Sequence, residues 1–334
     1  MTEPVITFVV VNYDTGAMVR RCVESFAGQS TPWRMVVVDN PTPAGHDPSL
    51  DGLPALAGTN GHVEIRRAPE NQGYGRACNL GLSDVATPYV GVLNPDTALP
   101  PGALDRWMAA IAREMNHGLA AGRRPVGLLA PTLLNDNGTA QRSVYRFQNG
   151  LNYWAYHSLL AGLLKTLKKR PGSPPSAGQP AGAGGGGGFR PGAAVEIEWA
   201  MGAAYLLPAD AWRAVAGFDP DYFLYAEDTD LCWRLRAAGY RVMHAPDVAI
   251  VHTQGEPSAA RRGDSMIRLF AGLKLFTSKR LPPARRLGLR AAVLLDMLIR
   301  FALFAPLVLV RPGDTLTRSR LRGALTVLGM YLRS

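Results

Sequence analysis

The 334 residues suffice for one large α/β domain with an appendage, or for two domains, and a hydrophobic fraction of 47% supports a sizeable core. Three cysteines, odd in number and far apart, exclude a disulfide framework and show no zinc-site spacing. The net charge of +10 favours a negatively charged partner, such as a membrane surface, nucleic acid or a phosphorylated substrate. An excess of arginine follows equally from a GC-rich genome.

The cysteines and the first residues indicate a cytoplasmic protein. Cys22, Cys78 and Cys232 lie in apolar helical contexts and are expected to be buried small hydrophobes, as in a reducing compartment. A strand begins almost at once, over residues 5–11, and the basic region and cleavage site of a signal peptide are lacking. We therefore expect that the protein is not exported.

Buried strands and helices alternate in the first part of the chain. Continuous apolar runs predict strands buried on both faces, over residues 6–13, 35–40, 63–68, 89–96 and 126–134. Helical spacing of apolar residues predicts helices over residues 19–26, 75–82 and 104–112. This alternation predicts an α/β fold with a mostly parallel, doubly wound sheet.

Polar residues gather where these predicted strands end. Asn12 follows the first strand, Asp39 and Asn40 the second, and Asn94 and Asp96 a later one. Each of them alone is also a favoured turn residue. Because ligands of such sheets bind outside the carboxyl ends of the strands, three polar strand ends on one edge predict a ligand site.

Residues 170–194 contain the sequence PGSPPS and a run of five glycines over 184–188. This composition predicts a disordered low-complexity insert. A phosphate-binding loop needs a strand before it and a helix after it, and neither pattern is present here.

Residues 223–242 place three acidic residues, Glu227, Asp228 and Asp230, at the start of a predicted helix. Leu231 and Leu235 share one face of this helix, Gly239 ends it, and residues 240–243 read as a strand. The positive end of the helix dipole is expected to favour ionised carboxylates, one of which could serve as a general base. The alternative is an ordinary acidic first turn without a catalytic role.

The C-terminal region changes character after residue 283. Residues 291–310 are apolar enough to span a bilayer, but Asp296 and Arg300 would be costly at its centre. On a helical wheel they share a side with Arg285, Arg286 and Arg290, which predicts an amphipathic helix lying in the membrane interface. Pro306 is expected to kink it, and residues 321–332 predict a second helix. The alternative is a helix packed on the catalytic domain.

Several segments together resemble family 2 glycosyltransferases of the GT-A fold, and especially their rhamnosyltransferase-like branch. The resemblance covers residues 5–258, and its specificity lies in the order and spacing of the segments. They read VVVNY, VVVDN, ENQGYGRACNLG, VLNPDT, EWAMGAAYLLPADAWRAVAGFDPDYFLYAEDTDLCWRLRAAGY and HTQGEPS. It implies a catalytic domain over residues 1–260, with the insert at 170–194, and a helical membrane-associating region over 261–334.

The resemblance implies a nucleotide-sugar site at the strand ends. In this family an acid after the second strand, here Asp39, contacts the uracil or thymine of the donor, and the alternative is an Asx-turn. Pro41-Thr42-Pro43 departs from the Ser- or Thr-containing turn that often follows this acid. The implied nucleotide-sugar-binding residues are Asn12, Asp39, Asn71, Gly73, Asn79 and Asn94.

The segment Asn94-Pro95-Asp96 resembles the acidic metal-binding motif of the family, with Asn94 in the place of the first aspartate. The resemblance implies that Asp96 binds Mg²⁺ or Mn²⁺, together with phosphate oxygens of the donor. His252 matches a histidine that some members use as a further metal ligand. The alternative for His252 is a strand-end residue that only forms hydrogen bonds.

The resemblance also assigns the catalytic roles. Asp228 would be the base, and Glu227 would position the acceptor or orient the loop. The acceptor side would be formed by Trp199, Gly202 and Ala203. We expect Asp230 to pair with Arg234 on the helix surface, as a structural contact.

The expected reaction is an inverting sugar transfer from a dTDP-, UDP- or GDP-sugar, possible donors including dTDP-rhamnose. The implied acceptor is a polyprenyl-linked or cell-surface glycan, and the enzyme would be peripheral at the cytoplasmic face of the cell membrane. A non-catalytic nucleotide-sugar-binding or scaffold protein of the same fold is the alternative. We expect no nucleic-acid partner, because the arginines are spread out and no aromatic–basic stacking motif is present.

Overall fold

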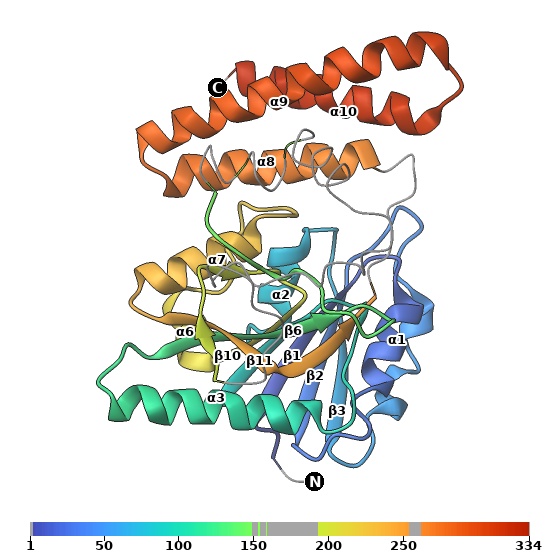
Figure 1. Ribbon diagram of the computed structural model, residues 1–334. Coiled ribbons are helices and arrows are strands. Elements are labelled where there is room, and N and C mark those ends of the chain that lie inside the picture. Colours follow the sequence, from blue (N-terminus) through green and yellow to red (C-terminus); the bar gives the residue numbers. More distant parts are fainter. Residues whose placement is uncertain (1–2, 149–152, 154–157, 159–192, 254–261, 334) are drawn as a thin grey trace. The chain divides into compact units, whose positions relative to one another are not determined.

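The computed structural model describes residues 3–148, 153, 158, 193–253 and 262–333 (Figure 1). The chain divides into two compact units. The first comprises residues 1–145, 177–223 and 227–254, and the second comprises residues 146–176, 224–226 and 255–334. The low-complexity insert predicted at residues 170–194 lies, except for its last two residues, outside the described residues.

A mixed sheet forms the centre of the first unit, with the strand order β3-β2-β1-β4-β10-β6-β11-β5. Its first four strands are all parallel, and β1 lies between β2 and β4. The strands are β1 (Ile6–Asn12), β2 (Trp33–Asp39), β3 (Gly61–Arg67), β4 (Tyr89–Leu93), β5 (Thr97–Ala98), β6 (Val126–Leu134), β10 (Ala204–Pro208) and β11 (Arg241–His252). The short β8 (Val195–Glu196) pairs with β11. These positions confirm the five strands predicted in the first part of the chain. The predicted burial on both faces is wrong for β3, because β3 lies at the edge of the sheet and only its Val63 is buried.

Two strands differ from the sequence prediction. β10 was not predicted as a strand, and it runs antiparallel between β4 and β6, which makes the sheet mixed. β11 was predicted only over residues 240–243, but it continues to His252 through an irregularity between Ala245 and Ala249. Such an irregularity re-aims the side chains that follow it. β11 thereby carries His252 to the short β5, where it pairs with Thr97.

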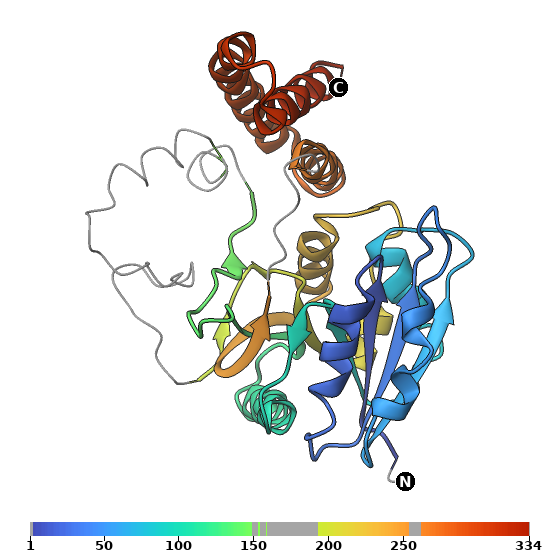
Figure 2. The same ribbon diagram turned by 90° about the vertical axis from the view of Figure 1, so that its right-hand side faces the viewer.

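Helices cover both faces of this sheet (Figures 1 and 2). Phe8 and Val10 of β1 pack in one core cluster, whereas Val9 and Val11 pack in the other. The first cluster includes residues of α1 (Gly16–Glu24) and α3 (Ala103–Ala120). The second includes residues of α2 (Tyr74–Gly81), α6 (Ala209–Ala214) and α7 (Glu227–Ala237). Burial on both faces explains why the strands read as continuous apolar runs.

The cysteines behave as the sequence predicts. All three are free thiols, and all three side chains are buried. Burial raises the pKa of Cys22 and of Cys232 to about 12. Such thiols remain protonated at neutral pH and act as small apolar groups.

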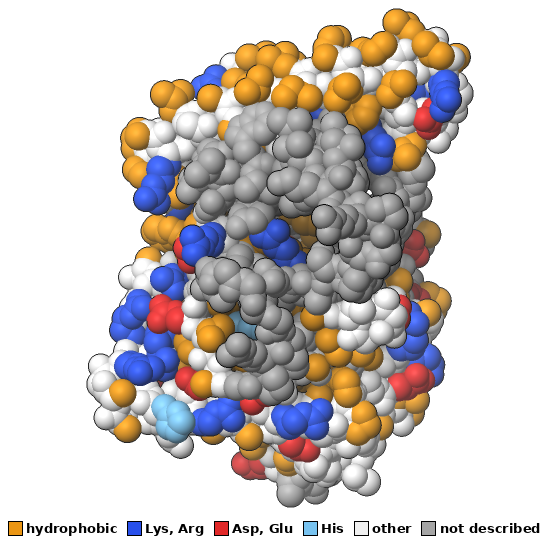
Figure 3. All heavy atoms as spheres, in the orientation of Figure 1, with side chains coloured by type: hydrophobic (Ala, Val, Ile, Leu, Met, Phe, Trp, Pro, Cys, Tyr) orange, Lys and Arg blue, Asp and Glu red, His pale blue; other side chains and the backbone are white. Residues whose placement is uncertain are grey.

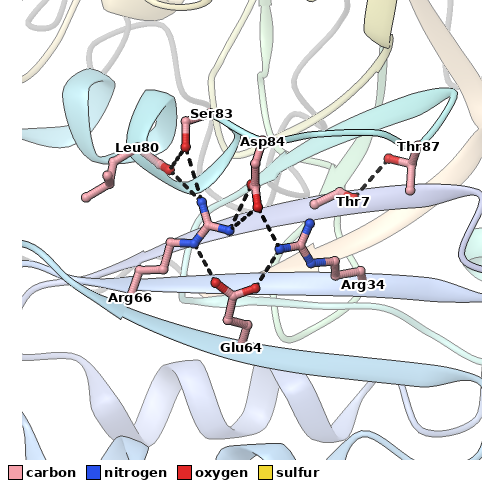
Figure 4. Close-up of polar contacts among 8 residues, drawn as sticks. All are labelled: Thr7, Arg34, Glu64, Arg66, Leu80, Ser83, Asp84 and Thr87. Atoms are coloured by element: carbon pink, nitrogen blue, oxygen red, sulfur yellow. Dashed lines mark hydrogen bonds and ion pairs between the residues drawn. The ribbon is translucent and has the colours of Figure 1, made fainter.

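An ion-pair network ties the edge of the sheet to the end of α2 (Figure 4). Arg34 of β2 and Arg66 of β3 both contact Glu64 and Asp84, and Arg66 donates to both oxygens of Asp84 at 2.8 Å. Arg66 also donates to the carbonyl of Leu80 at 3.0 Å, in the last turn of α2. The Arg66 guanidinium lowers the pKa of both carboxyl groups. Because these groups are partly exposed, the network contributes to local order more than to stability.

The second unit contains three long helices, α8 (Arg262–Arg280), α9 (Pro283–Val310) and α10 (Thr315–Leu332). α10 packs against both of the others. It begins six residues earlier than predicted, because Asp314 accepts hydrogen bonds from the N–H groups of Leu316 and Thr317. α9 continues through Pro306, so this proline does not end the helix.

Two residues of the predicted polar side of α9, Asp296 and Arg300, face inward, so the prediction that they face water was wrong, whereas Arg285 and Arg286 are exposed. Asp296 is fully buried and accepts hydrogen bonds from the Tyr153 hydroxyl at 2.8 Å and from Arg300 Nε at 2.9 Å. The core around them contains Phe270, Leu289, Val293, Met297, Val327 and Tyr331. Asp296 and Arg300 therefore share the packed face of α9, not a water-facing one.

The outward face of α9 is apolar. Its exposed large hydrophobic residues are Leu287, Leu295, Leu298, Phe301, Leu303, Leu307, Leu309 and Val310. Hydrophobic side chains gather over α9 and α10, with Lys or Arg side chains among them (Figure 3). By length and composition α9 could cross a membrane, with a mean hydropathy of 2.3 over a window that is 22% buried. Those two properties do not distinguish a spanning helix from one that lies on a surface.

Candidate active site

Two adjacent acids begin α7, and their backbone is set by an unusual turn. Tyr225 and Ala226, directly before Glu227, both have positive φ angles, of 72° and 68°. Residues with side chains rarely adopt this conformation, and such strain is concentrated at functional sites. The Glu227 side chain is buried, and its Oε2 atom has no hydrogen-bond partner among the described residues.

Asp228 is held by backbone N–H groups. Its Oδ1 accepts from the N–H of Thr229 at 2.7 Å, and its Oδ2 accepts from the N–H of Gly202 at 3.1 Å. A Cβ atom on Gly202 would lie 3.0 Å from the Cβ of Asp228, so glycine permits this close approach. The structure thus brings Gly202, predicted on the acceptor side, to the predicted base.

Burial changes the ionisation that the sequence predicted for this pair. Burial, followed by the neighbouring Asp228 charge, raises the pKa of Glu227 to about 8. Burial also raises the pKa of Asp228, although backbone N–H groups oppose the shift. The helix dipole had been expected to favour ionised carboxylates. Burial outweighs that effect here, because two like charges in a dry site are disfavoured. The raised pKa of Glu227 favours its protonated form beside Asp228 near neutral pH.

The third acid of this turn has a different environment. Asp230 is fully buried and accepts from Arg234 Nε at 2.6 Å and from the Tyr222 hydroxyl at 3.2 Å. The predicted pairing of Asp230 with Arg234 is confirmed. The predicted surface location is wrong, because the pair closes an internal contact between α7 and the preceding loop.

Of the predicted acceptor-side residues, Gly202 contacts Asp228 directly, and Trp199 lies on a short strand in contact with α7. Trp199 stacks on Tyr145, with ring centroids 4.6 Å apart and planes inclined by 20°. The two residues face each other across a small sheet of β7 (Val144–Tyr145) and β9 (Trp199–Ala200). The carbonyl of Ala203 accepts from the N–H of Asn94 at 2.9 Å, which connects this side to the strand-end polar residues.

Asp96 and His252, predicted as metal ligands, lie together. His252 Nε2 is 3.3 Å from Asp96 Oδ1, and that buried oxygen forms no hydrogen bond among the described residues. His252 Nδ1 is 2.8 Å from Oε1 of Gln141, whose Nε2 donates to the carbonyl of His252. Because Oε1 can only accept, Nδ1 carries the ring proton, and Nε2 has a lone pair directed to the Asp96 side.

This donor set suits a divalent cation. An unbonded carboxylate oxygen and an imidazole lone pair are ligand types that Mn²⁺ and Mg²⁺ accept to different degrees. Among the described residues no cluster of three or more His, Cys, Asp or Glu side chains could hold a metal ion. A metal at Asp96 and His252 would therefore need further oxygens from its ligand or solvent.

Asp39 and Asn12 also meet, at the ends of β2 and β1. Asn12 Nδ2 donates to Asp39 Oδ1 at 2.8 Å, and both side chains are buried. Asp39 Oδ2 lies 3.0 Å from Nδ1 of His46 and accepts from the N–H of Asp47 at 3.0 Å. His46 was not predicted, because no recognised spacing marks a histidine seven residues after the acid.

Asn71 and Gly73 form the turn that leads into α2. Asn71 Oδ1 accepts from the N–H of Gly73 at 3.1 Å, and the carbonyl of Gly73 accepts from Asn40 Nδ2 at 3.2 Å. A side chain on Gly73, whose φ angle is 82°, would collide with the carbonyl of Phe223. Asn40 Oδ1 is buried and has no hydrogen-bond partner in the part of the chain that the structure describes, so it remains available to a ligand that donates a hydrogen.

Asn79 lies apart from these groups. Its Nδ2 donates to the carbonyl of Phe218 at 2.7 Å, and its Oδ1 accepts from the N–H of Phe218 at 2.9 Å. Both polar ends of the side chain are thus used to fix one backbone segment. The predicted site otherwise forms one stretch along the carboxyl ends of β2, β1 and β4, continued by Gly202 and α7.

Comparison with known proteins agrees with this arrangement. The family described as Glycosyl transferase family 2 matches residues 7–158, and that described as Glycosyl transferase family group 2 matches residues 190–328. The chain is similar to the N-acetylglucosaminyl-diphospho-decaprenol L-rhamnosyltransferase of Mycobacterium tuberculosis, with 27% identity over 75% of this chain and 76% of that protein. Rhamnosyltransferase WbbL of Escherichia coli is 39% identical over 17% of this chain and 21% of its own.

A solved structure shares the fold. GalNAc-T7, described with UDP, GalNAc and Mn²⁺, superposes with a TM-score of 0.51 and 12% identity, over 82% of this chain and 47% of that chain. At this identity the likeness concerns the fold alone, and it supports the α/β GT-A architecture expected from the sequence. The two family matches and the rhamnosyltransferase relatives identify the activity class. The chain belongs to the family 2 glycosyltransferases.

Proposed function

We propose that this enzyme is an inverting, metal-dependent glycosyltransferase in which Asp228 is the catalytic base. The observation that carries the proposal is the buried Glu227–Asp228 pair, to which no Lys or Arg side chain is bonded among the described residues. A raised pKa brings Asp228 closer to the pH at which a general base is most effective. A protonated Glu227 leaves the single negative charge of the pair on Asp228.

The chemistry follows from how Asp228 is held. The N–H groups of Gly202 and Thr229 fix both carboxylate oxygens, so the side chain needs little reorganisation when it accepts a proton. The acceptor hydroxyl loses its proton to Asp228 as its oxygen attacks the anomeric carbon of the donor. One displacement inverts the configuration at that carbon, and no enzyme nucleophile is required.

Asp96 and His252 would hold the divalent cation, with Gln141 orienting the imidazole. When bound, Mn²⁺ or Mg²⁺ offsets the charge that develops on the leaving nucleoside diphosphate. Asn40, Asn71 and Gly73 would lie along the donor, whereas the contacts of Asn79 suit a structural role. Asn12 would act by fixing Asp39.

The names of the relatives support a narrower substrate class. The M. tuberculosis relative is a rhamnosyltransferase named for a diphospho-decaprenol acceptor. We infer a nucleotide-activated deoxyhexose, such as dTDP-rhamnose, as the donor and a polyprenyl-diphosphate-linked saccharide as the acceptor. UDP- and GDP-sugars are the competing donors.

An assay with the purified full-length chain tests this function. Nucleotide sugars are incubated with a polyprenyl-diphosphate saccharide and Mn²⁺, and the products are separated and their anomeric configuration determined. We expect transfer with inversion, loss of activity with EDTA and recovery with added Mn²⁺. Retention of configuration, or full activity in EDTA, would contradict the mechanism.

The helical unit supports a location at the cytoplasmic face of the cell membrane, with residues 1–260 as the catalytic domain and 261–334 as the membrane-associating region. The outward face of α9 is apolar while its charged pair, Asp296 and Arg300, is inside. Polar groups inside and leucines outside are typical of a surface in contact with lipid. Exposed arginines at the start of α9, such as Arg285 and Arg286, suit anionic headgroups.

Sedimentation with vesicles checks this association. Leu298→Glu combined with Phe301→Glu is expected to move the protein from vesicles containing anionic lipid to the supernatant. Leu119→Glu is the control, because Leu119 is an exposed leucine on α3 of the other unit. Unchanged sedimentation of the double variant would contradict lipid contact through α9.

A further inference from the structure

Both strand-end carboxylates beside β1 are paired with a histidine, and the second histidine has no assigned role. Asp96 adjoins His252, and Asp39 adjoins His46. His46 lies in the segment after β2, which departs from the family pattern at Pro41-Thr42-Pro43. Its side chain is 34% exposed, whereas that of Asp39 is 1% exposed.

Asp39 is poorly placed to contact a ligand directly. Its Oδ1 accepts from Asn12, and its Oδ2 faces both the His46 ring and the N–H of Asp47. One acceptor position of the carboxylate is left, on Oδ1, but the side chain is only 1% exposed, so a ligand could reach it only by moving a group that covers it. Leaving a buried donor unbonded costs about 1–3 kcal/mol. The exposed partner, His46, is the group that a ligand can reach without such a loss.

The contacts of Asp39 determine which nitrogen of His46 is protonated. The carboxylate accepts hydrogen bonds at both oxygens, so Nδ1 of His46 must be the donor of the bond between them. In the neutral ring Nε2 then carries a lone pair. None of the described residues donates a hydrogen bond to that nitrogen. Asp39 thus orients an acceptor atom that lies farther from the core than its own oxygens.

The position in the sheet is where a ligand is expected. β2 and β3 extend on one side of β1, and β4 lies on the other, so the strand order reverses beside β1. Ligands of such sheets bind outside the carboxyl ends of the strands at this reversal. Asn12 and Asp39 are paired at the ends of β1 and β2, and Asp96 follows β4. His46 and His252 thus each contact a carboxylate that follows or ends a strand next to β1, on its two sides.

We propose that Nε2 of His46 accepts a hydrogen bond from the ring N–H of the donor's nucleobase, and that Asp39 acts through it as a positioning residue. Uracil, thymine and guanine present such a ring N–H, whereas cytosine presents a lone pair at the corresponding atom. An acceptor on the protein distinguishes these two cases, because cytosine would place two lone pairs together. The proposal rests on the proposed function, since it concerns the donor of the same transfer.

The proposal is tested by calorimetric titration of the protein with UDP and with CDP, at pH 8 and in the presence of Mn²⁺. The two nucleotides differ at the ring nitrogen that carries the proton in uracil. We expect the wild-type protein to bind UDP at least about tenfold more tightly than CDP, a difference of about 1.4 kcal/mol. His46→Ala is expected to remove this preference while retaining the affinity that the diphosphate supplies. His62→Ala is the control, because His62 is an exposed histidine at the amino end of β3, whereas the proposed site lies at the carboxyl ends of the strands.

The outcomes separate the proposal from the function on which it rests. If His46→Ala keeps the preference for UDP while Asp39→Asn removes it, the carboxylate reads the base directly and the proposal is wrong. If the wild-type protein binds UDP and CDP equally, the proposal is also wrong, although sugar transfer can still occur. If neither nucleotide binds and no transfer is observed, the proposed function fails as well.

A second measurement does not depend on nucleotide binding. ¹⁵N spectra of the histidine rings should show His46 with its proton on Nδ1, and Asp39→Asn should disturb that signal but not the signal of His62. A ring proton found on Nε2 in the free protein would overturn the proposal. Melting curves of His46→Ala and Asp39→Asn show whether either change unfolds the protein.

Discussion

The first turn of α7 and the middle of α9 both bury carboxylates, but they satisfy them differently. Asp296 in α9 is bonded to Arg300 and to the Tyr153 hydroxyl. Glu227 and Asp228 in α7 have each other and a few backbone N–H groups. A buried charge is costly unless it is paired, and an unpaired acid reduces the cost by keeping its proton. Asp296 therefore has the contacts of a structural acid, whereas the environment of Glu227 and Asp228 suits the catalytic role proposed for Asp228.

Asp230 shows the same distinction within one turn of helix. It lies two residues after Asp228 and is more deeply buried than Glu227, yet it is paired with Arg234 and Tyr222. Burial alone therefore does not mark a catalytic acid. Among the described residues, Asp230 has a cation beside its carboxylate, Arg234, and Asp228 has none.

Removing the charge of Asp228 should have the largest effect. Asp228→Asn keeps the shape of the side chain but cannot accept the proton, so kcat should fall by roughly 10²–10⁴. Donor affinity should remain close to that of the wild type, as measured by calorimetry. Asp210→Asn, an exposed acid on α6, is the control. A change of less than about threefold in kcat would remove Asp228 as the base.

Breaking the α9 pair should affect stability instead of chemistry. Asp296→Asn leaves the Arg300 guanidinium in the interior without its counter-charge, so the free energy of unfolding should fall by about 3–5 kcal/mol. Denaturant unfolding of the full chain measures this loss. Asp296→Leu combined with Arg300→Met should recover part of it, because no charge then remains buried. A double variant no better than Asp296→Asn would contradict the pairing.

The smallest expected effect is a pH dependence from Glu227. The pKa is raised from its ordinary value of 4.5 to about 8, so between these values the folded protein holds a proton that the unfolded chain has released. The stabilisation is fully present below about pH 4.5 and is lost as the pH rises through 8. Glu227→Gln removes this pH-dependent stabilisation. The Tm of the variant relative to that of the wild type should therefore rise from pH 5 to pH 9. A constant difference would mean that Glu227 is ionised in the folded protein.

The sequence was most informative about the sheet and the order of its polar ends. The apolar runs that became β1, β2 and β4 fit burial on both faces, and the predicted polar residues do follow their carboxyl ends. β10 was not predicted because it is only five residues long, and its antiparallel direction depends on partners distant in sequence. The prediction that Asp296 and Arg300 of α9 face water failed for a similar reason. A helical wheel shows which residues share a side, but not what that side meets.

The sequence by itself determined the α/β class, the family and most of the residues in the candidate site, because local periodicity and motif spacing are written along the chain. Tertiary structure decided which of those residues are paired. It joined Asp39 to His46, brought His252 to Asp96 at the end of a long strand, and placed Asp296 inside. It also buried Glu227 and Asp228 with no Lys or Arg of the described residues bonded to them, and this burial raises both of their pKa values.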